Sequence, residues 1–153
     1  MDGASYFMRH DAVILVAEDD DGHFSLIKRN LVRAGISNKI IRLSDGQEAL
    51  EFLGQLKNSN NPYSRCPCLL LLDIRMPKVD GFEVLKFVKN DPLLKKIPVI
   101  ILTTAGDQEV FDKCQDYGCN MFIAKPVEYA EFTESIIRIS HFISIIEVPS
   151  VIT

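Results

Sequence analysis

Acidic, hydroxyl and basic side chains follow short apolar runs at several points along the chain. They are Glu18, Asp19 and Asp20 after the first run, Asp73 after the third, Thr103 and Thr104 after the fourth, and Lys125 after the fifth. Carboxylates gathered in one cleft repel one another unless a cation lies between them. Oxygen donors without His or Cys favour a hard ion, here Mg²⁺ (or Mn²⁺) rather than Ca²⁺. Lys125 adds a positive charge suited to a transferred phosphoryl group.

Each of these residues also has an ordinary structural interpretation. An acidic triplet is commonly a solvated turn, an aspartate at a strand end often caps a helix, and a lysine before proline commonly lies on the surface. Their joint position after different strands is what favours a functional site, because ligands of doubly wound sheets bind outside the carboxyl ends of the strands. The hypothesis therefore depends on the elements that carry these residues.

Five apolar runs rich in Val, Ile and Leu predict five strands. They cover residues 13–16, 40–43, 69–72, 99–102 and 121–124. The runs are continuous rather than alternating, which is typical of strands buried on both faces of a parallel sheet. The segments between them have helical spacing, so the chain alternates between strands and helices. This pattern predicts a doubly wound α/β sandwich with right-handed crossovers.

Turn and cap signals delimit the predicted helices. Asp45-Gly46 and Asp80-Gly81 begin the second and third helices, and Asp91-Pro92 ends the third. A fourth helix is predicted over residues 107–117, ending at Gly118, which suits a left-handed helix terminus. Residues 57–65 are a polar loop that we interpret as an insertion.

Length and composition favour one globular domain in a chain of 153 residues, with 47% hydrophobic residues and a net charge of −4. No apolar run reaches the roughly 20 residues that span a bilayer, and no signal peptide precedes the first strand. Basic residues are scattered, which argues against a nucleic-acid surface. The four cysteines lack the spacing of a zinc site, so we expect reduced thiols in a cytoplasmic protein.

The expected organisation is a flexible leader at residues 1–11, a single domain at 12–146 and a C-terminal tail at 147–153. Residues 128–146 are rich in Ile and Phe at positions that cover more than one helical stripe. Two interpretations stay open for this segment. It is either an ordinary core helix with an irregular tail, or a surface for self-association.

The motifs ILVAEDD, LLLLDIRMPKVDGFEVL, PVIILTT and FIAKP together resemble the receiver domains of response regulators in two-component signalling. The resemblance covers residues 12–143 and is specific, because all four motifs occur in the family's order and spacing. It implies a flavodoxin-like (βα)5 fold with strand order 2-1-3-4-5. The polar loop before the third strand resembles the single-domain receivers that partner bacteriophytochromes.

The resemblance implies a role for each site residue. Asp73 would be the phosphoryl acceptor, with Lys125 and Thr103 contacting the phosphoryl oxygens. Mg²⁺ would be bound by Glu18, Asp19, Asp73 and the backbone carbonyl of Arg75. Thr103 is preferred to its neighbour Thr104 as the switch residue. Phe122 either fills the space that Thr103 leaves or is simply a core residue, and Lys125-Pro126 would be a cis peptide.

The function expected from these roles is Mg²⁺-dependent transfer of a phosphoryl group from a sensor histidine kinase, or a phosphotransfer protein, to Asp73. Such a protein is a switch rather than an enzyme, and its output would be protein contact, including a homodimer through the fourth helix, fifth strand and last helix. Two alternatives are a degenerate receiver that only binds a partner and an aspartate-nucleophile phosphatase. The phosphatase needs a second Asp where the chain has Arg75.

Overall fold

The five apolar runs form one parallel sheet in the computed structural model. The structure describes residues 12–104, 107–119, 121–125, 134, 137–138 and 150–152, without the side chains of Thr104, Ala124 and Lys125. The strands are β1 (Val13–Ala17), β2 (Lys39–Leu43), β3 (Cys68–Asp73), β4 (Val99–Thr104) and β5 (Met121–Lys125). Their order is β2-β1-β3-β4-β5, as predicted. Strands β3, β4 and β5 extend beyond the predicted runs, so Asp73, Thr103 and Lys125 lie within strand ends rather than after them.

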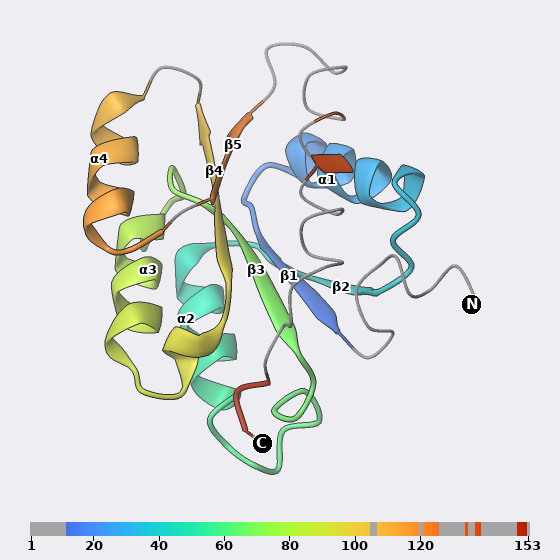
Figure 1. Ribbon diagram of the computed structural model, residues 1–153, viewed down its shortest axis with the longest axis vertical. Helices are drawn as coiled ribbons and strands as arrows, with labels where there is room; N and C mark the ends of the chain where they lie inside the picture. Colours follow the sequence, from blue (N-terminus) through green and yellow to red (C-terminus); the bar gives the residue numbers. More distant parts are fainter. Residues whose placement is uncertain are drawn as a thin grey trace.

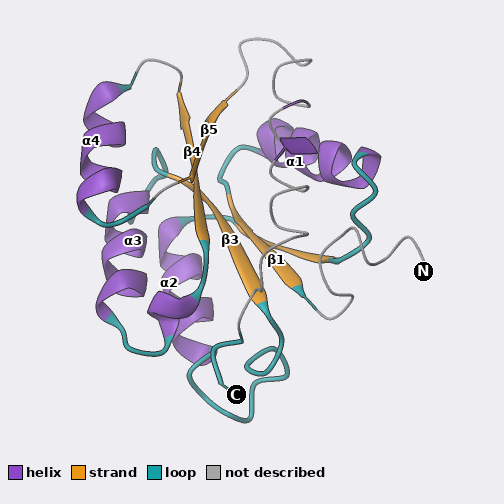
Figure 2. Ribbon diagram, viewed as in Figure 1, coloured by secondary structure: helices purple, strands orange, loops and turns teal. Residues whose placement is uncertain are grey.

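Helices cover both faces of the sheet, which explains why the central strands β1 and β3 are almost entirely apolar. They are α1 (Asp21–Arg33), α2 (Gly46–Gln55), α3 (Gly81–Asn90) and α4 (Gln108–Asp116), with a short 3₁₀ helix η2 (Leu94–Lys96) before β4. Figure 1 shows α2, α3 and α4 together on one face and α1 on the other. Figure 2 shows the same alternation of helices and strands by element type. The predicted doubly wound α/β sandwich is confirmed for the residues described.

Alternate residues of the central strands feed two separate cores. Leu70 and Leu72 of β3 pack on the side of α2–α4, whereas Leu69 and Leu71 pack on the side of α1. All residues of β1 and β3 are buried, while the edge strand β2 is mostly half-exposed. Continuous burial of a central parallel strand requires the continuous apolar runs seen in the sequence.

Aspartate side chains cap the N-termini of the four α-helices in the described part of the chain. Asp20, Asp45, Asp80 and Asp107 each accept a hydrogen bond from the backbone N–H three residues later. Such caps satisfy N–H groups that have no partner within the helix, and the negative charge is favourable at a helix N-terminus. The predicted caps at Asp45 and Asp80 are confirmed, so an aspartate at a strand or loop end here is often a cap.

The predicted helix ends are also confirmed. Helix α3 ends at Asn90 with Asp91 as its C-cap, and α4 lies between Asp107 and Tyr117. Gly118 follows α4 with φ of 82°, the left-handed conformation for which glycine is suited. The short helix η2 was not predicted, because three residues carry no periodic signal.

The chain's last described residues contact the loop between α2 and β3. Ser150 pairs with Pro67 in an antiparallel bridge, and the N–H of Ile152 donates to the Ser64 carbonyl at 2.8 Å. Val151 is fully buried within the core on the α2–α4 side. Residues 150–152, expected within a tail, therefore pack against the domain, beside the loop seen near the C-terminus in Figure 1.

Several expectations lie outside the described residues: the leader at 1–11, the helix over 128–146, and the isomer of Lys125-Pro126. Among the residues described, no helix has both the length and the apolar character needed to cross a bilayer.

Candidate functional site

Three of the predicted site carboxylates converge at one edge of the sheet. Glu18 and Asp19 follow β1, and Asp73 is the last residue of β3. The strands pair in parallel with Ala17 opposite Leu72, so the residues that come next lie side by side. Carboxylate oxygens of Glu18, Asp19 and Asp73 all lie within 4.8 Å of one another. The predicted convergence of these three residues is therefore what the structure shows.

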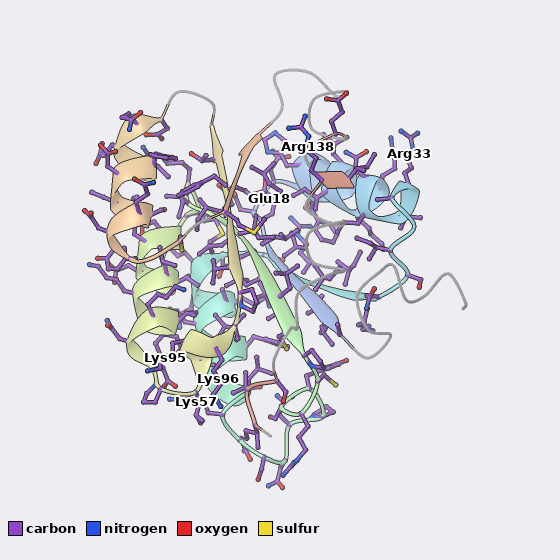
Figure 3. All side chains as sticks on the ribbon, in the orientation of Figure 1. Glu18, Arg33, Lys57, Lys95, Lys96 and Arg138 are labelled. Atoms are coloured by element: carbon purple, nitrogen blue, oxygen red, sulfur yellow. The ribbon has the colours of Figure 1, made fainter. Side chains whose placement is uncertain are left out.

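The burial of these carboxylates suits a divalent cation. Glu18 is fully buried and Asp73 is only 2% exposed, while Asp19 faces solvent. Figure 3 shows Glu18 in the upper half of the view, away from Lys57, Lys95 and Lys96 in the lower half. Negative charges this close are costly to desolvate unless positive charge is shared among them. An all-oxygen donor set that is open to solvent at Asp19 fits Mg²⁺ or Mn²⁺, which keep several water ligands.

His23 is a member of the site that the sequence did not reveal. Its Nδ1 lies 2.9 Å from Oε1 of Glu18, and its backbone N–H donates to Oδ1 of Asp20 at 2.8 Å. The ring is half exposed at the first turn of α1. The N-cap hydrogen bond keeps the His23 backbone beside Asp20, but the packing of α1 on the sheet brings its ring to Glu18. His23 thereby holds one oxygen of Glu18 in place.

Arg42 of β2 also contacts the loop that carries the acidic residues. Its Nε donates to the carbonyl oxygen of Glu18 at 3.1 Å and its Nη2 to that of Asp19 at 3.0 Å. Its Nη1 forms a 2.6 Å ion pair with Asp21, and the guanidinium lies 5.0 Å from the ring centre of Phe24. The sequence reasoning missed Arg42, since nothing in the spacing relates β2 to this loop.

The loop after Asp73 is tightly packed against the start of α3. The Arg75 N–H donates to Oδ1 of Asp73 at 3.1 Å, and the N–H groups of Met76 and Gly81 donate to the Ile74 carbonyl at 3.1 and 2.9 Å. A Cβ on Gly81 would lie 2.5 Å from the carbonyl oxygen of Asp73. Only glycine permits this close approach, which sets the position of the Asp73 backbone.

Two ion pairs tie this loop to the neighbouring helices. Arg75 pairs with Asp107, the N-cap of α4, at 2.8 Å, and Lys78 pairs with Asp45, the N-cap of α2, at 3.1 Å. The guanidinium lowers the pKa of Asp107, and Asp107 in turn raises that of Arg75. The pKa of Asp45 is lowered by the Glu48 N–H and then by Lys78. The loop beside Asp73 is thus connected to the first turns of α2 and α4.

The hydroxyl positions lie on β4, which pairs with the strand of Asp73, and the lysine position lies on β5, which pairs with β4. In the register of the sheet, Leu102 is opposite Asp73, and Thr104 is opposite Lys125. Thr103 is half-buried at the end of β4. The side chains of Thr104 and Lys125 are outside the described residues, so their contacts, the choice between the two threonines and the metal role of the Arg75 carbonyl stay predictions.

Phe122 lies on the same face of the sheet as Thr103. Ile101 is opposite Phe122, and side chains alternate along a strand, so Thr103 shares their face. Phe122 packs on Phe111 of α4 with ring centres 4.7 Å apart, a contact that the sequence did not indicate. Phe111 is 36% exposed. Phe122, on the face that Thr103 shares, is therefore in contact with the partly exposed surface of α4.

The four cysteines are free thiols. Burial raises the pKa of both Cys68 and Cys114 to about 12, which keeps these two sulfurs protonated and unreactive at neutral pH. Cys68 and Cys114 therefore belong to the packing of the domain.

Comparisons with known proteins agree with the fold and the acidic site described above. The response regulator receiver domain model matches residues 14–137. The response regulator Rcp1 of Synechocystis is 37% identical over 113 residues, covering 74% of this chain and 76% of Rcp1. The solved structure of Mn²⁺-bound Rcp1 matches with a TM-score of 0.76 at 31% identity, and the match covers 90% of this chain and 99% of the Rcp1 chain.

Two further solved structures extend the match. A receiver domain from Rhodospirillum rubrum is 39% identical with a TM-score of 0.81, covering 92% of this chain and 99% of its own. The phosphorylated cyanobacterial phytochrome response regulator RcpA is 32% identical with a TM-score of 0.78, covering 93% and 100%. Bacteriophytochrome response regulators also match, so the predicted resemblance is confirmed. The chain belongs to the response regulator receiver domains, the switch modules of two-component signalling.

Proposed function

We propose that this receiver domain accepts a phosphoryl group on Asp73 in a reaction that depends on Mg²⁺ or Mn²⁺. The observation that carries the proposal is the convergence of Glu18, Asp19 and Asp73 within 4.8 Å at the carboxyl edge of the sheet. Asp73 is held there by the Arg75 N–H and by the contact of Gly81 with its backbone. A carboxylate in a fixed position beside two others is suited to phosphoryl transfer, in which positioning and charge neutralisation supply most of the catalysis.

In the proposed reaction an oxygen of Asp73 attacks phosphorus and the bond from phosphorus to the phosphohistidine nitrogen breaks. The product is an aspartyl phosphate and a neutral histidine on the donor. Glu18, Asp19, Asp73 and the Arg75 carbonyl would hold the divalent cation, whose chemistry is to neutralise negative charge on the phosphoryl oxygens. Lys125 and the hydroxyl of Thr103 would contact the remaining oxygens.

The proposed output is a change at α4 and β5. If Thr103 moves toward the phosphoryl group, the space it leaves lies on the face occupied by Phe122. Phe122 contacts Phe111, so a change in its position reaches the exposed side of α4. The Arg75–Asp107 ion pair connects the same helix to the loop beside Asp73. Phosphorylation would bias two arrangements of this surface, because it adds charge at a site where these contacts meet.

The proposed partners are a sensor histidine kinase or phosphotransfer protein, and a second copy of the chain through α4, β5 and the last helix. The free thiols suit a reducing compartment, so we place the protein in the cytoplasm. We regard it as a switch rather than an enzyme with a separate substrate. The alternatives are a receiver that only binds a partner, and an aspartate-nucleophile phosphatase.

The test is incubation with Mg²⁺ and acetyl phosphate, followed by intact-mass measurement. We expect one labile phosphoryl adduct in the wild type, none in Asp73→Asn, and an unchanged adduct in the control Asp112→Asn, which alters an exposed aspartate of α4. No adduct with any donor would support the binding module instead. An adduct that survives in Asp73→Asn would contradict the assigned acceptor, and repeated turnover of phosphate esters would favour the phosphatase.

A further inference from the structure

Arg42 holds the backbone that carries two of the proposed metal ligands. It donates to the carbonyl oxygens of Glu18 and Asp19, forms an ion pair with Asp21 and covers the ring of Phe24. The guanidinium thus reaches, from β2, both the loop after β1 and the first turn of α1. One side chain ties three separate segments of the chain together at the edge of the site.

The two backbone contacts explain why an arginine is needed here. Asp21 is 92% exposed, and ion pairs at such exposed positions contribute little to stability. The carbonyl contacts are different, because Nε and Nη2 lie in one rigid plane and donate to consecutive peptide groups of the loop. A lysine has a single donor position at its tip and cannot reproduce this fork. Packing on Phe24 fixes the direction of the plane.

The end of β2 holds the same loop at a further point. The Glu18 N–H donates to the Leu43 carbonyl at 3.1 Å, so the peptide groups before and after Glu18 are both bound by adjacent residues of β2. With both peptide groups bound, the backbone at Glu18 cannot move away from Asp73 without breaking these hydrogen bonds. Repulsion between the carboxylates would otherwise favour such a movement in the absence of a cation.

We propose that Arg42 is a positioning residue of the metal site, which holds Glu18 and Asp19 in their metal-binding arrangement before the cation arrives. The inference rests on the metal-dependent function proposed above. It assigns to an arginine on a different strand the role that outer-shell partners have in metal sites, where they orient the ligands and raise affinity.

The positive charge of Arg42 opposes cation binding, whereas its positioning of the loop favours it. A positive side chain near the site repels Mg²⁺ or Mn²⁺, so loss of charge alone would tighten binding. Loss of positioning weakens binding. Arg42→Lys keeps the charge and loses the fork, whereas Arg42→Met loses both, so the pair of variants separates the two effects.

The test is a titration of the full chain with Mn²⁺. The electron paramagnetic resonance signal of the free ion measures how much Mn²⁺ is bound, and Mg²⁺ serves as a competitor. We expect Arg42→Lys to bind Mn²⁺ about 10-fold more weakly than wild type, in the range found for outer-shell changes. Arg42→Met should lose less affinity, because it also removes the charge that repels the cation. The ratio of the Arg42→Lys affinity to the wild-type affinity should hold at low and high salt, since the two proteins carry the same charge. The control Arg29→Lys alters an exposed arginine of α1 and should bind like wild type.

Hydrogen exchange of the metal-free protein gives a readout independent of the metal. In Arg42→Lys we expect the Glu18 amide to exchange faster while amides in the middle of β3 stay as in wild type. Binding by Arg42→Lys equal to wild type, or faster exchange throughout the sheet, would overturn the inference and leave the proposed function intact. A wild-type protein that binds no Mn²⁺ would overturn both.

Discussion

Gly81 begins α3 at a point where the helix touches the backbone of the proposed phosphoryl acceptor. A Cβ at this position would lie 2.5 Å from the Asp73 carbonyl oxygen, 2.6 Å from Cα of Ile74 and 2.9 Å from its Cδ1. Two of these three neighbours are backbone atoms, which cannot rotate away as a side chain can. The substitution Gly81→Ala must therefore move either the start of α3 or the end of β3.

The size of the effect follows from these distances. Carbon atoms pack favourably at about 3.5–4.0 Å, so the Cα of Ile74 is roughly 1 Å too close. Overpacking of this kind typically costs about 1–3 kcal/mol, and the better helix propensity of alanine offsets less than about 1 kcal/mol of it. We expect Gly81→Ala to lower the free energy of unfolding by about 2 kcal/mol, which corresponds to a Tm lower by roughly 4–8 °C.

The site should suffer more than the fold. A displacement of Asp73 by a fraction of an ångström disturbs its alignment, and misplacements near 1 Å can cost about 100-fold in rate. We expect phosphorylation of Gly81→Ala by acetyl phosphate to be roughly 10- to 100-fold slower than in wild type.

Denaturant unfolding measures the stability change, and the rate of adduct formation by intact mass measures the change in reactivity. The matched control is Gly54→Ala, where the new Cβ would lie 3.9 Å from Phe87 in ordinary contact. This control should be as stable as wild type or more stable, with an unchanged phosphorylation rate. Wild-type stability and rate in Gly81→Ala would refute the reasoning from the close approach.

Three further predictions concern stability. Lys78 has φ of 66°, and both Lys78→Gly and Lys78→Ala lose the ion pair with Asp45, but only alanine keeps the strain of the left-handed conformation. Lys78→Gly should therefore be more stable than Lys78→Ala by about 1 kcal/mol in denaturant unfolding. Equal stabilities would contradict this. Lys57 is the main cause of the lowered pKa of Asp91, and a carboxyl with a lowered folded pKa stabilises the fold above its unfolded pKa and loses that contribution as pH falls through the folded one. Lys57→Met should therefore be less stable than wild type at pH 7 by roughly 0.5 kcal/mol, with the difference shrinking as pH falls below the unfolded value near 3.8; a difference independent of pH would argue against the ion pair. Val151 is fully buried, so Val151→Ala should lower the free energy of unfolding by about 2 kcal/mol, because two methyl groups are lost and a cavity is left. A thermal scan that shows no change in Tm would mean that residues 150–152 detach in solution.

The fold was predictable because its signals are local and repeated. Continuous apolar runs in β1 and β3 could only be buried on both faces, and that requirement led to a parallel sheet with helices on either side. Aspartates and glycines marked helix starts and ends within a residue or two, as at Asp45, Asp80 and Gly118. The strand order itself came from the family resemblance, because alternation of elements leaves several orders open.

The burial of the short segment at residues 150–152 could not be predicted in the same way. Val151 has no periodic neighbours that mark it as part of the core, and the contacts of Ile152 with Ser64 and of Ser150 with Pro67 join segments far apart in the chain. The same holds for η2, which is too short to carry a pattern.

For the site, the sequence by itself determined which chemistry is available and roughly where. Glu18, Asp19 and Asp73 were expected at one edge, because parallel strands bring their carboxyl ends to the same edge of a sheet, and the strand order of the family places the first strand beside the third. The tertiary structure alone decided how that edge is held. Arg42 reaches the acidic loop from β2, His23 contacts Glu18 from α1, and Phe111 meets Phe122 from α4. These contacts depend on distances between elements that only packing sets, so no spacing along the chain could indicate them.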